Sequence, residues 1–221
     1  MPVYVKLFNV IFSSGNVLES WLIENIIPFY KNKGDQLDPQ NYRPITILSC
    51  LGKLFTSVLN LRVSSFLENF LLLKENQFGF RKSYSTTDSI FVLHLLFELL
   101  RNKKKKLSCA FIDFAKAFDT VWHAGLWSKL LKYSVNGKMF NTIKNMYSNI
   151  KSRIFYSNEF SEFFPCNVGV RQGENLSPIL FSLYVNDLED FLIEKNIDGL
   201  KSLSDELETE LDCYLKLFII L

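Results

Sequence analysis

The spacing of apolar residues changes along the chain and predicts an order of elements. Residues 3–12 and 16–25 have the spacing of short helical pieces. They lead into Ile26–Tyr30, which is predicted as a strand followed by a basic turn. Residues 42–48 are predicted to return as a second extended segment, because Pro44 disfavours helix at the residue before it.

Helical periodicity predicts the longer elements. Between Leu51 and Leu71, the apolar stripe expected to face the core consists of Leu54, Val58, Leu61, Val63, Phe66, Leu67 and Phe70. Residues 85–88 have the composition of a helix start, and residues 90–100 continue with helical spacing. Further helices are expected at 124–134, at 138–149 and at 177–193, the last of them beginning with a Ser-Pro pair.

Strand-like runs complete the pattern. Leu107–Phe114 is a short apolar run with one charge, Asp113, near its end, and it is predicted as a buried strand. Segregated helices and strands indicate an α+β fold rather than a βαβ alternation. The remaining expected features are a β-hairpin of residues 152–158 and 161–169 with its turn at 157–159, an acidic stretch at 198–212 and a strand at 215–221.

Composition narrows the class of protein. The chain has 221 residues, of which 48% are hydrophobic and 22% charged, an ordinary mixture for a globular protein. Residues 1–106 hold 14 Lys and Arg against 8 Asp and Glu, whereas residues 107–221 hold 11 against 15, so the basic half could contact a polyanion. The four cysteines are far apart, which argues against a zinc module or a disulfide framework. No apolar run approaches the ~20 residues that span a bilayer, so we expect a soluble intracellular protein in the nucleus or cytoplasm.

Asp113 is the first candidate for chemistry. A carboxylate at the end of an apolar strand is costly unless it is paired or holds a cation. Asp119 follows six residues later, and carboxylates of this kind bind Mg²⁺ at phosphoryl-transfer sites. The structural alternative is that Asp113 caps the following turn and that Asp119 pairs with a Lys.

Two further patterns could contact a ligand. In Gly169–Gly173, two glycines flank Val-Arg-Gln just before a predicted helix, so the backbone could approach a ligand closely, or the segment could simply end a hairpin and cap the helix. Basic residues beside predicted turns could bind phosphate oxygens, or could be solvated surface; they are Lys31, Lys33, Arg43, Arg81 and Lys82.

Four motifs in order resemble one family. They are Asn41-Tyr42-Arg43-Pro44-Ile45, Asn76-Gln77-Phe78-Gly79-Phe80-Arg81, Phe111-Ile112-Asp113-Phe114-Ala115-Lys116-Ala117-Phe118-Asp119 and Gly169-Val170-Arg171-Gln172-Gly173-Glu174-Asn175-Leu176-Ser177-Pro178. Together they resemble the reverse transcriptase domain of non-LTR (LINE-type) retrotransposons, from about Leu22 to the end of the chain.

The resemblance implies a right-hand polymerase with fingers at 1–106 and a partial palm at 107–221, the thumb being absent. It implies an RNA-directed DNA polymerase that takes an RNA template, a DNA primer and a deoxynucleoside triphosphate, with Mg²⁺ (or Mn²⁺) in a complete active site. Asp113 and the carbonyl of Phe114 would bind metal, and Asp119 would be structural. The implied nucleotide and template contacts are Phe118, which would reject a ribose 2′-hydroxyl, and Gln172 and Gly173. Arg43, together with Lys31 or Lys33, would hold the triphosphate, with Arg81 as a helper.

One departure from the family pattern concerns the second catalytic carboxylate. The family continues with a strand that ends in Tyr-Ala-Asp-Asp, and this motif does not occur in the 221 residues. Two-metal nucleotidyl transfer needs both carboxylates to hold cations ~3.5–4 Å apart. We therefore expect negligible polymerase activity from this chain alone.

Two other functions remain open at this stage. The chain could be a non-catalytic nucleic-acid-binding or relic protein. It could also be an unrelated Mg²⁺ phosphohydrolase, if the carboxylates of Asp113 and Asp119 converge.

Overall fold

The computed structural model describes residues 2–104, 109 and 111–195. The chain divides into two compact units. The first contains Met1–Leu67 and Lys116–Phe181, and the second contains Glu68–Ala115 with the chain from Ser182 onward. Each unit is made of two stretches of sequence, so the boundary between the compact units is not at residue 106. The expected division at residue 106 separates fingers from palm, and it stays a prediction.

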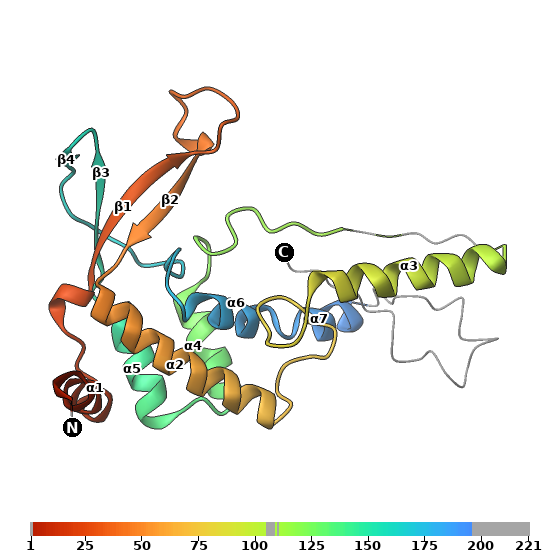
Figure 1. The fold of residues 1–221 in the computed structure, drawn as a ribbon, viewed down its shortest axis with the longest axis horizontal. Helices are drawn as coiled ribbons and strands as arrows, with labels where there is room; N and C mark the ends of the chain where they lie inside the picture. The colour runs from red at the N-terminus through yellow and green to blue at the C-terminus, as the bar shows by residue number, and fades with distance from the viewer. Residues whose placement is uncertain (1, 105–108, 110, 196–221) are drawn as a thin grey trace. The chain divides into compact units, whose positions relative to one another are not determined.

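The structure is a mixed α and β fold (Figure 1). Its elements are, in chain order, α1 (Val3–Ser14), the 3₁₀ turn η1 (Glu19–Trp21), β1 (Ile23–Tyr30), the 3₁₀ turn η2 (Pro39–Asn41), β2 (Tyr42–Ile47), α2 (Cys50–Asn69), α3 (Thr86–Asn102), α4 (His123–Lys132), α5 (Gly137–Tyr147), β3 (Lys151–Tyr156), β4 (Glu159–Phe160), β5 (Phe164–Pro165), α6 (Ser177–Val185) and α7 (Leu188–Glu194). No described helix is long and apolar enough to cross a membrane.

The sheet belongs to the first unit. β1 and β2 form an antiparallel hairpin, visible in orange in Figure 1, and β3 pairs parallel to β1. The strand order is β2-β1-β3-β4, and β5 also pairs with β3. The predicted hairpin turn is confirmed, since Ser157 and Asn158 have φ of 51° and 65°, the left-handed pair that a two-residue turn requires. The second strand, predicted at 161–169, is instead two short strands, because the chain pairs with β3 directly after the turn in β4 and again in β5.

The helix predicted from Leu51 is confirmed as α2, but its buried face differs from the predicted stripe. The side chains at four-residue spacing are buried: Phe55, Leu59, Val63 and Leu67. Leu54 and Leu61, which were expected to face the core, are exposed. A step of four residues turns only about 40° around a helix, so the true stripe stays on one face, whereas the predicted set mixed two faces.

An aromatic cluster fixes α1 and α2 against the start of the sheet. The rings of Trp21 and Phe55 are both buried, with centroids 5.5 Å apart, and Phe8 of α1 lies 5.3 Å from Phe55. Gly52 of α2 lies against the indole, and a Cβ there would be in van der Waals contact with the Trp21 ring at 3.4 Å. Residues 16–25, predicted as helical, form η1 and the first part of β1 instead, since Glu24 and its neighbours pair with β3.

In the second unit, α3 begins at the predicted position. Ser85 caps the helix, and its side chain and that of Asp88 form a reciprocal capping box.

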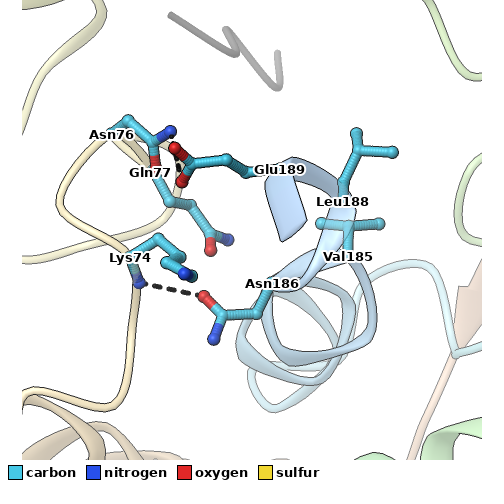
Figure 2. A pocket seen from close by; sticks show the side chains of 7 residues that line it. All are labelled: Lys74, Asn76, Gln77, Val185, Asn186, Leu188 and Glu189. Atoms are coloured by element: carbon cyan, nitrogen blue, oxygen red, sulfur yellow. Dashed lines mark hydrogen bonds between the residues drawn. The ribbon is translucent and has the colours of Figure 1, made fainter. Parts of the chain in front are cut away.

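The helix predicted over 177–193 is two helices, separated at Asn186. The Asn186 side chain is buried, and its Oδ1 accepts from the Lys74 backbone N–H at 3.0 Å (Figure 2). Its Nδ2 donates to the Leu72 carbonyl at 2.9 Å, so Asn186 binds the 72–74 loop at two points. A side chain that caps another segment in this way favours a break over continued helix.

One predicted strand is not present in the described residues. Phe111–Phe114 has no regular secondary structure, and Phe111 and Ile112 are 78% and 52% exposed. A strand is held by hydrogen bonds to a neighbouring strand, and none of the described pairings includes this segment. The prediction of a buried strand is therefore wrong for the described part of 107–114. The acidic stretch at 198–212 and the strand predicted at 215–221 lie outside the described residues.

Candidate nucleotide and template site

The candidate site is built where two sequence motifs meet in the first unit. The loop Gly169–Gly173 donates two backbone hydrogen bonds to the turn Lys116–Val121: Gly169 N–H donates to the Val121 carbonyl at 2.8 Å, and Val170 N–H donates to the Phe118 carbonyl at 2.7 Å. Two segments that are about 50 residues apart in sequence are thus joined by a pair of backbone hydrogen bonds. This brings the end of the Asp113-containing motif beside the Gln172-containing motif.

Gly169 makes this approach possible. Its φ is +90°, and a Cβ at this position would lie 2.9 Å from the Asp119 carbonyl oxygen and 3.0 Å from that of Phe118. Both neighbours are backbone atoms that cannot swing away. The first glycine of the motif is therefore required by conformation and by space together.

Gln172 and Asp119 are directly bonded. The Gln172 Nε2 donates to Asp119 Oδ1 at 2.7 Å. Asp119 thus accepts from an amide, rather than from a Lys as the structural alternative in the sequence had it. Its carboxylate positions Gln172.

The loop is also tied to the β1–β2 hairpin. The Thr46 N–H of β2 donates to the Gln172 carbonyl at 3.2 Å. Gly173 has a φ of +101°, and a Cβ at this position would lie 3.3 Å from the Thr46 carbonyl oxygen, which is a tight contact. On the following turn, the Asn175 side chain donates to the Lys53 carbonyl and to the Ser57 hydroxyl of α2. Gln172 and Gly173 therefore have a fixed place at the base of the hairpin.

The predicted basic residues lie farther along the hairpin. Arg43 is exposed on β2, opposite Phe29 and three residues from Thr46, or about 10 Å along a strand. Lys31 follows β1, and its Nζ donates to the Gln40 carbonyl at 2.8 Å. Lys33 is exposed in the same connecting loop. The hairpin thus carries the three residues outward from the Gln172 loop.

Phe118 is half-buried in the turn. Its ring packs edge-on against Phe181 of α6, with the centroids 5.3 Å apart. This contact holds the ring at the junction of the turn and the helix.

Arg81, in the second unit, has a different environment from the other predicted basic residues. It is only 7% exposed. Its Nε and Nη2 donate to the two carboxylate oxygens of Glu68 at 2.9 and 2.7 Å, and its Nη1 donates to the carbonyls of Lys74 and Gln77. The guanidinium also lies over the Tyr84 ring at 3.9 Å. These contacts fold the loop from Leu72 to Tyr84 around one buried cation.

A small pocket borders the same loop (Figure 2). Asn76 Nδ2 donates to Glu189 Oε2 at 3.1 Å across it, and Lys74 Nζ lies 2.7 Å from Asp190 Oδ1. Its volume of about 20 Å³ has room for about one water molecule. The pocket is too small for a nucleotide.

Asp113 and Phe114, the predicted metal ligands, are both exposed. Among the described residues, no group of three or more His, Cys, Asp or Glu side chains could hold a metal ion. A pair of Mg²⁺ ions needs several carboxylate oxygens. The described residues alone do not fit such a pair, because Asp119 is bonded to Gln172 and Asp113 stands by itself.

A buried ionic cluster behind the Gln172 loop was not predicted from the sequence. Arg171, 6% exposed, donates from Nε to Glu24 Oε1 at 2.6 Å and from Nη2 to the Met146 carbonyl at 3.0 Å. Its Nη1 lies 3.5 Å from Glu174 Oε1. The Tyr147 hydroxyl donates to Glu174 Oε2 at 2.9 Å, and the Ser152 hydroxyl donates to Glu24 Oε2 at 2.8 Å.

The cluster has two carboxylates for one guanidinium. Burial raises the pKa of Glu174, although Arg171 and the Tyr147 hydroxyl oppose this. Burial and the Glu174 charge raise the pKa of Tyr147 well above its ordinary value, so its hydroxyl remains a donor. Burial alone would lower the pKa of Arg171, but the carboxylates more than reverse this and keep it charged.

His123 completes the wall of the site. Its Nε2 lies 2.7 Å from the Gly169 carbonyl, and a carbonyl can only accept, so Nε2 carries the hydrogen. The ring also packs edge-on against Tyr147. Glu24 could have been found by the argument applied to Asp113, since it is a lone charge in an apolar strand; His123 carries no such signal.

We predict that Gly169→Ala is much more destabilising than Gly137→Ala. Both glycines have positive φ, at +90° and +58°, which costs an Ala about 1–2 kcal/mol. A Cβ at Gly137 meets nothing within 4 Å, whereas at Gly169 it meets two carbonyl oxygens. The free energies of unfolding of the two variants, measured in urea, should therefore differ by the cost of the clash at Gly169. Equal losses of stability would contradict the close packing of the loop on the turn.

We predict that Glu174→Gln removes a pH dependence of stability. Because the folded pKa of Glu174 is raised, its contribution is present below the unfolded value of 4.5 and is lost as pH rises through the folded pKa. Relative to wild type, the Gln variant should therefore gain stability as pH is raised from 5 to 8. The exposed Glu162→Gln is the control in urea titrations, and a constant difference between Glu174→Gln and wild type across this range would refute the assignment.

Comparisons with known proteins identify the family. Residues 30–215 match the family model described as reverse transcriptase (RNA-dependent DNA polymerase). The chain is 31% identical over 172 residues to a probable RNA-directed DNA polymerase from transposon BS of Drosophila melanogaster, covering 77% of this chain and 19% of that protein. It is 31% identical over 185 residues to the RNA-directed DNA polymerase from mobile element jockey of Drosophila funebris, covering 83% and 20%.

A third relative is the retrovirus-related Pol polyprotein from the type-1 retrotransposable element R2 of Nasonia vitripennis, with 30% identity over 177 residues, 80% of this chain and 17% of that protein. The chain spans about a fifth of the length of these relatives. The motifs that meet at the Gln172 loop all lie in the matched region. The chain therefore belongs to the reverse transcriptase (RNA-dependent DNA polymerase) family, in the group found in non-LTR retrotransposons.

Proposed function

We propose that this chain supplies the nucleotide- and template-contacting part of an RNA-directed DNA polymerase. The observation that carries the proposal is the junction of the Lys116–Val121 turn, the Gly169–Gly173 loop and β2, where Gln172 is held by Asp119. A nucleotide-binding loop needs a backbone that a ligand can approach closely and a side chain that is held in one orientation. Gln172 and Gly173 have that character.

The proposed partners are an RNA template, a DNA primer and a deoxynucleoside triphosphate. Arg43, Lys31 and Lys33 would contact the triphosphate from the β1–β2 hairpin, since guanidinium and ammonium groups suit phosphate oxygens. In this assignment the residues 1–106 act as fingers and 107–221 as part of a palm. Phe118, packed on Phe181, would exclude a ribose 2′-hydroxyl through its bulk.

Arg81 receives a structural role in this proposal. Both carboxylate oxygens of Glu68 and two carbonyls occupy its N–H groups. Releasing a buried guanidinium from these partners to bind a triphosphate would leave the Glu68 carboxylate and the carbonyls without their donor. Arg81 thus supports the loop that follows α2.

The metal ions belong to a complete site. In this chain, the Asp113 carboxylate and the Phe114 carbonyl are the proposed ligands of one Mg²⁺ or Mn²⁺ ion, which would supply charge stabilisation for phosphoryl transfer once further carboxylates complete the site. We expect the polymerase to act inside the cell, in the nucleus or cytoplasm, where template and nucleotides are present.

We predict that the 221-residue chain alone extends a DNA primer on RNA at least about a thousandfold more slowly than the jockey polymerase. A missing metal clamp removes several kcal/mol of transition-state stabilisation, and each 1.36 kcal/mol is tenfold in rate. Primer extension with Mg²⁺ or Mn²⁺ measures this. Robust synthesis that depends on Asp113 would overturn the expectation of inactivity.

The second experiment tests for activity in a complete polymerase into which this chain is grafted. The matched 185 residues of the Drosophila funebris jockey polymerase are replaced by those of this chain. Synthesis that is lost in Asp113→Asn and reduced in Gln172→Ala, with Lys138→Ala as an exposed control, supports the proposal. A folded graft without synthesis favours the alternative, a non-catalytic nucleic-acid-binding or relic protein.

A further inference from the structure

The buried cation Arg171 lies next to Gln172 in the chain and is connected to three separate elements. Glu24 comes from the centre strand β1, Met146 from the end of α5 and Glu174 from the start of the following turn. Its guanidinium also lies 5.5 Å from the Tyr147 ring centroid. A planar fork with several N–H groups in fixed directions can satisfy such a set, and a lysine ammonium cannot do so with the same geometry.

These contacts fix the backbone on one side of the Gln172 side chain. The other side is fixed by the Gln172 carbonyl, which accepts a hydrogen bond from the Thr46 N–H of β2 at 3.2 Å. Between the two anchors, Gln172 has one described side-chain hydrogen bond, to Asp119. A loop held at both ends aims its middle residue, whereas a loop held at one end can rotate it.

We infer that Arg171 is a positioning residue that holds Gln172 in the orientation in which its Nε2 meets Asp119 Oδ1. Because Arg171 is buried, it acts through Gln172. This inference rests on the proposed function, in which Gln172 contacts the nucleotide or the template. Arg171 then determines how precisely Gln172 is placed for that contact. Glu24 is its principal counterion, because that bond is shorter by 0.9 Å than the Glu174 contact, 2.6 against 3.5 Å.

The test is a double-mutant cycle between Gln172→Ala and Asp119→Ala, measured by urea unfolding of the full chain in three backgrounds. In wild type we expect a coupling of about fivefold in the folding equilibrium constant. In Arg171→Lys, which keeps the charge and loses the fork, the coupling should fall below about twofold. A residue that contributes stability alone would lower all four corners of the cycle equally and leave the coupling unchanged.

The matched control is Arg153→Lys. Arg153 lies on β3 of the same sheet, donates from Nε to Asn25 Oδ1 at 2.7 Å and packs over the Phe160 ring at 3.7 Å. It has no described contact with the Gly169–Gly173 loop, so the fivefold coupling should persist. Unchanged coupling in Arg171→Lys, or equal loss in both arginine variants, overturns the inference.

Hydrogen exchange of the unmodified chain in low denaturant gives a second reading that does not depend on a variant folding. The Thr46 N–H donates to the loop, and the Gly169 and Val170 N–H groups donate from the loop to the turn. The three amide hydrogens should therefore exchange with solvent through one common opening of the loop. Separate openings would contradict a loop held as one body. Neither measurement uses polymerase activity, so the two proposals can fail separately. If the jockey graft is inactive while the Gln172–Asp119 coupling still depends on Arg171, the proposed function is rejected and the positioning role of Arg171 stands.

Discussion

A guanidinium buried between β1 and the Gly169–Gly173 loop is the interaction on which the site depends. Arg171 and Glu24 are 6% and 4% exposed, and their bond of 2.6 Å joins residues 147 positions apart. Removing one partner of such a pair leaves an uncompensated buried charge, which costs about 3–5 kcal/mol. The pair therefore makes the correct approach of strand and loop a condition of stable folding in this unit.

Backbone geometry then converts this approach into a site. Gly169 allows the loop to lie against the Lys116–Val121 turn at distances no side chain would permit, and the pair of backbone hydrogen bonds between them places Asp119 beside Gln172. The buried Tyr147 and Glu174 supply the rest of the wall. The Gln172 amide thus has a buried ionic cluster behind it, in keeping with the general need for supported groups at sites that must be geometrically precise.

The elements with strong local signals could be predicted from sequence. The helix start at Ser85, the turn at Ser157-Asn158 and the hairpin of β1 and β2 follow from capping, left-handed turn residues and proline. The buried face of α2 and the break at Asn186 could not, because they are decided by partners distant in sequence. The same holds for Phe111–Phe114: an apolar run is typical of a strand only when a neighbouring strand pairs with it.

The site divides in the same way. Motif order was sufficient to identify the family and to single out Gln172, Gly173 and Phe118. The roles of Glu24 and Arg171 depend on a pairing across 147 residues that no local pattern reports. Arg81 shows the converse, since a basic residue beside a turn was predicted to bind phosphate and is instead enclosed by Glu68 and two carbonyls.

The most direct measurement is the unfolding free energy of Glu24→Met, Arg171→Met and the double variant. If the buried pair organises the site, each single variant loses about 3 kcal/mol, and the double variant loses no more than the worse single one, because no unpaired charge remains between these two positions. Losses that simply add would show that Glu24 and Arg171 act independently and would contradict the account.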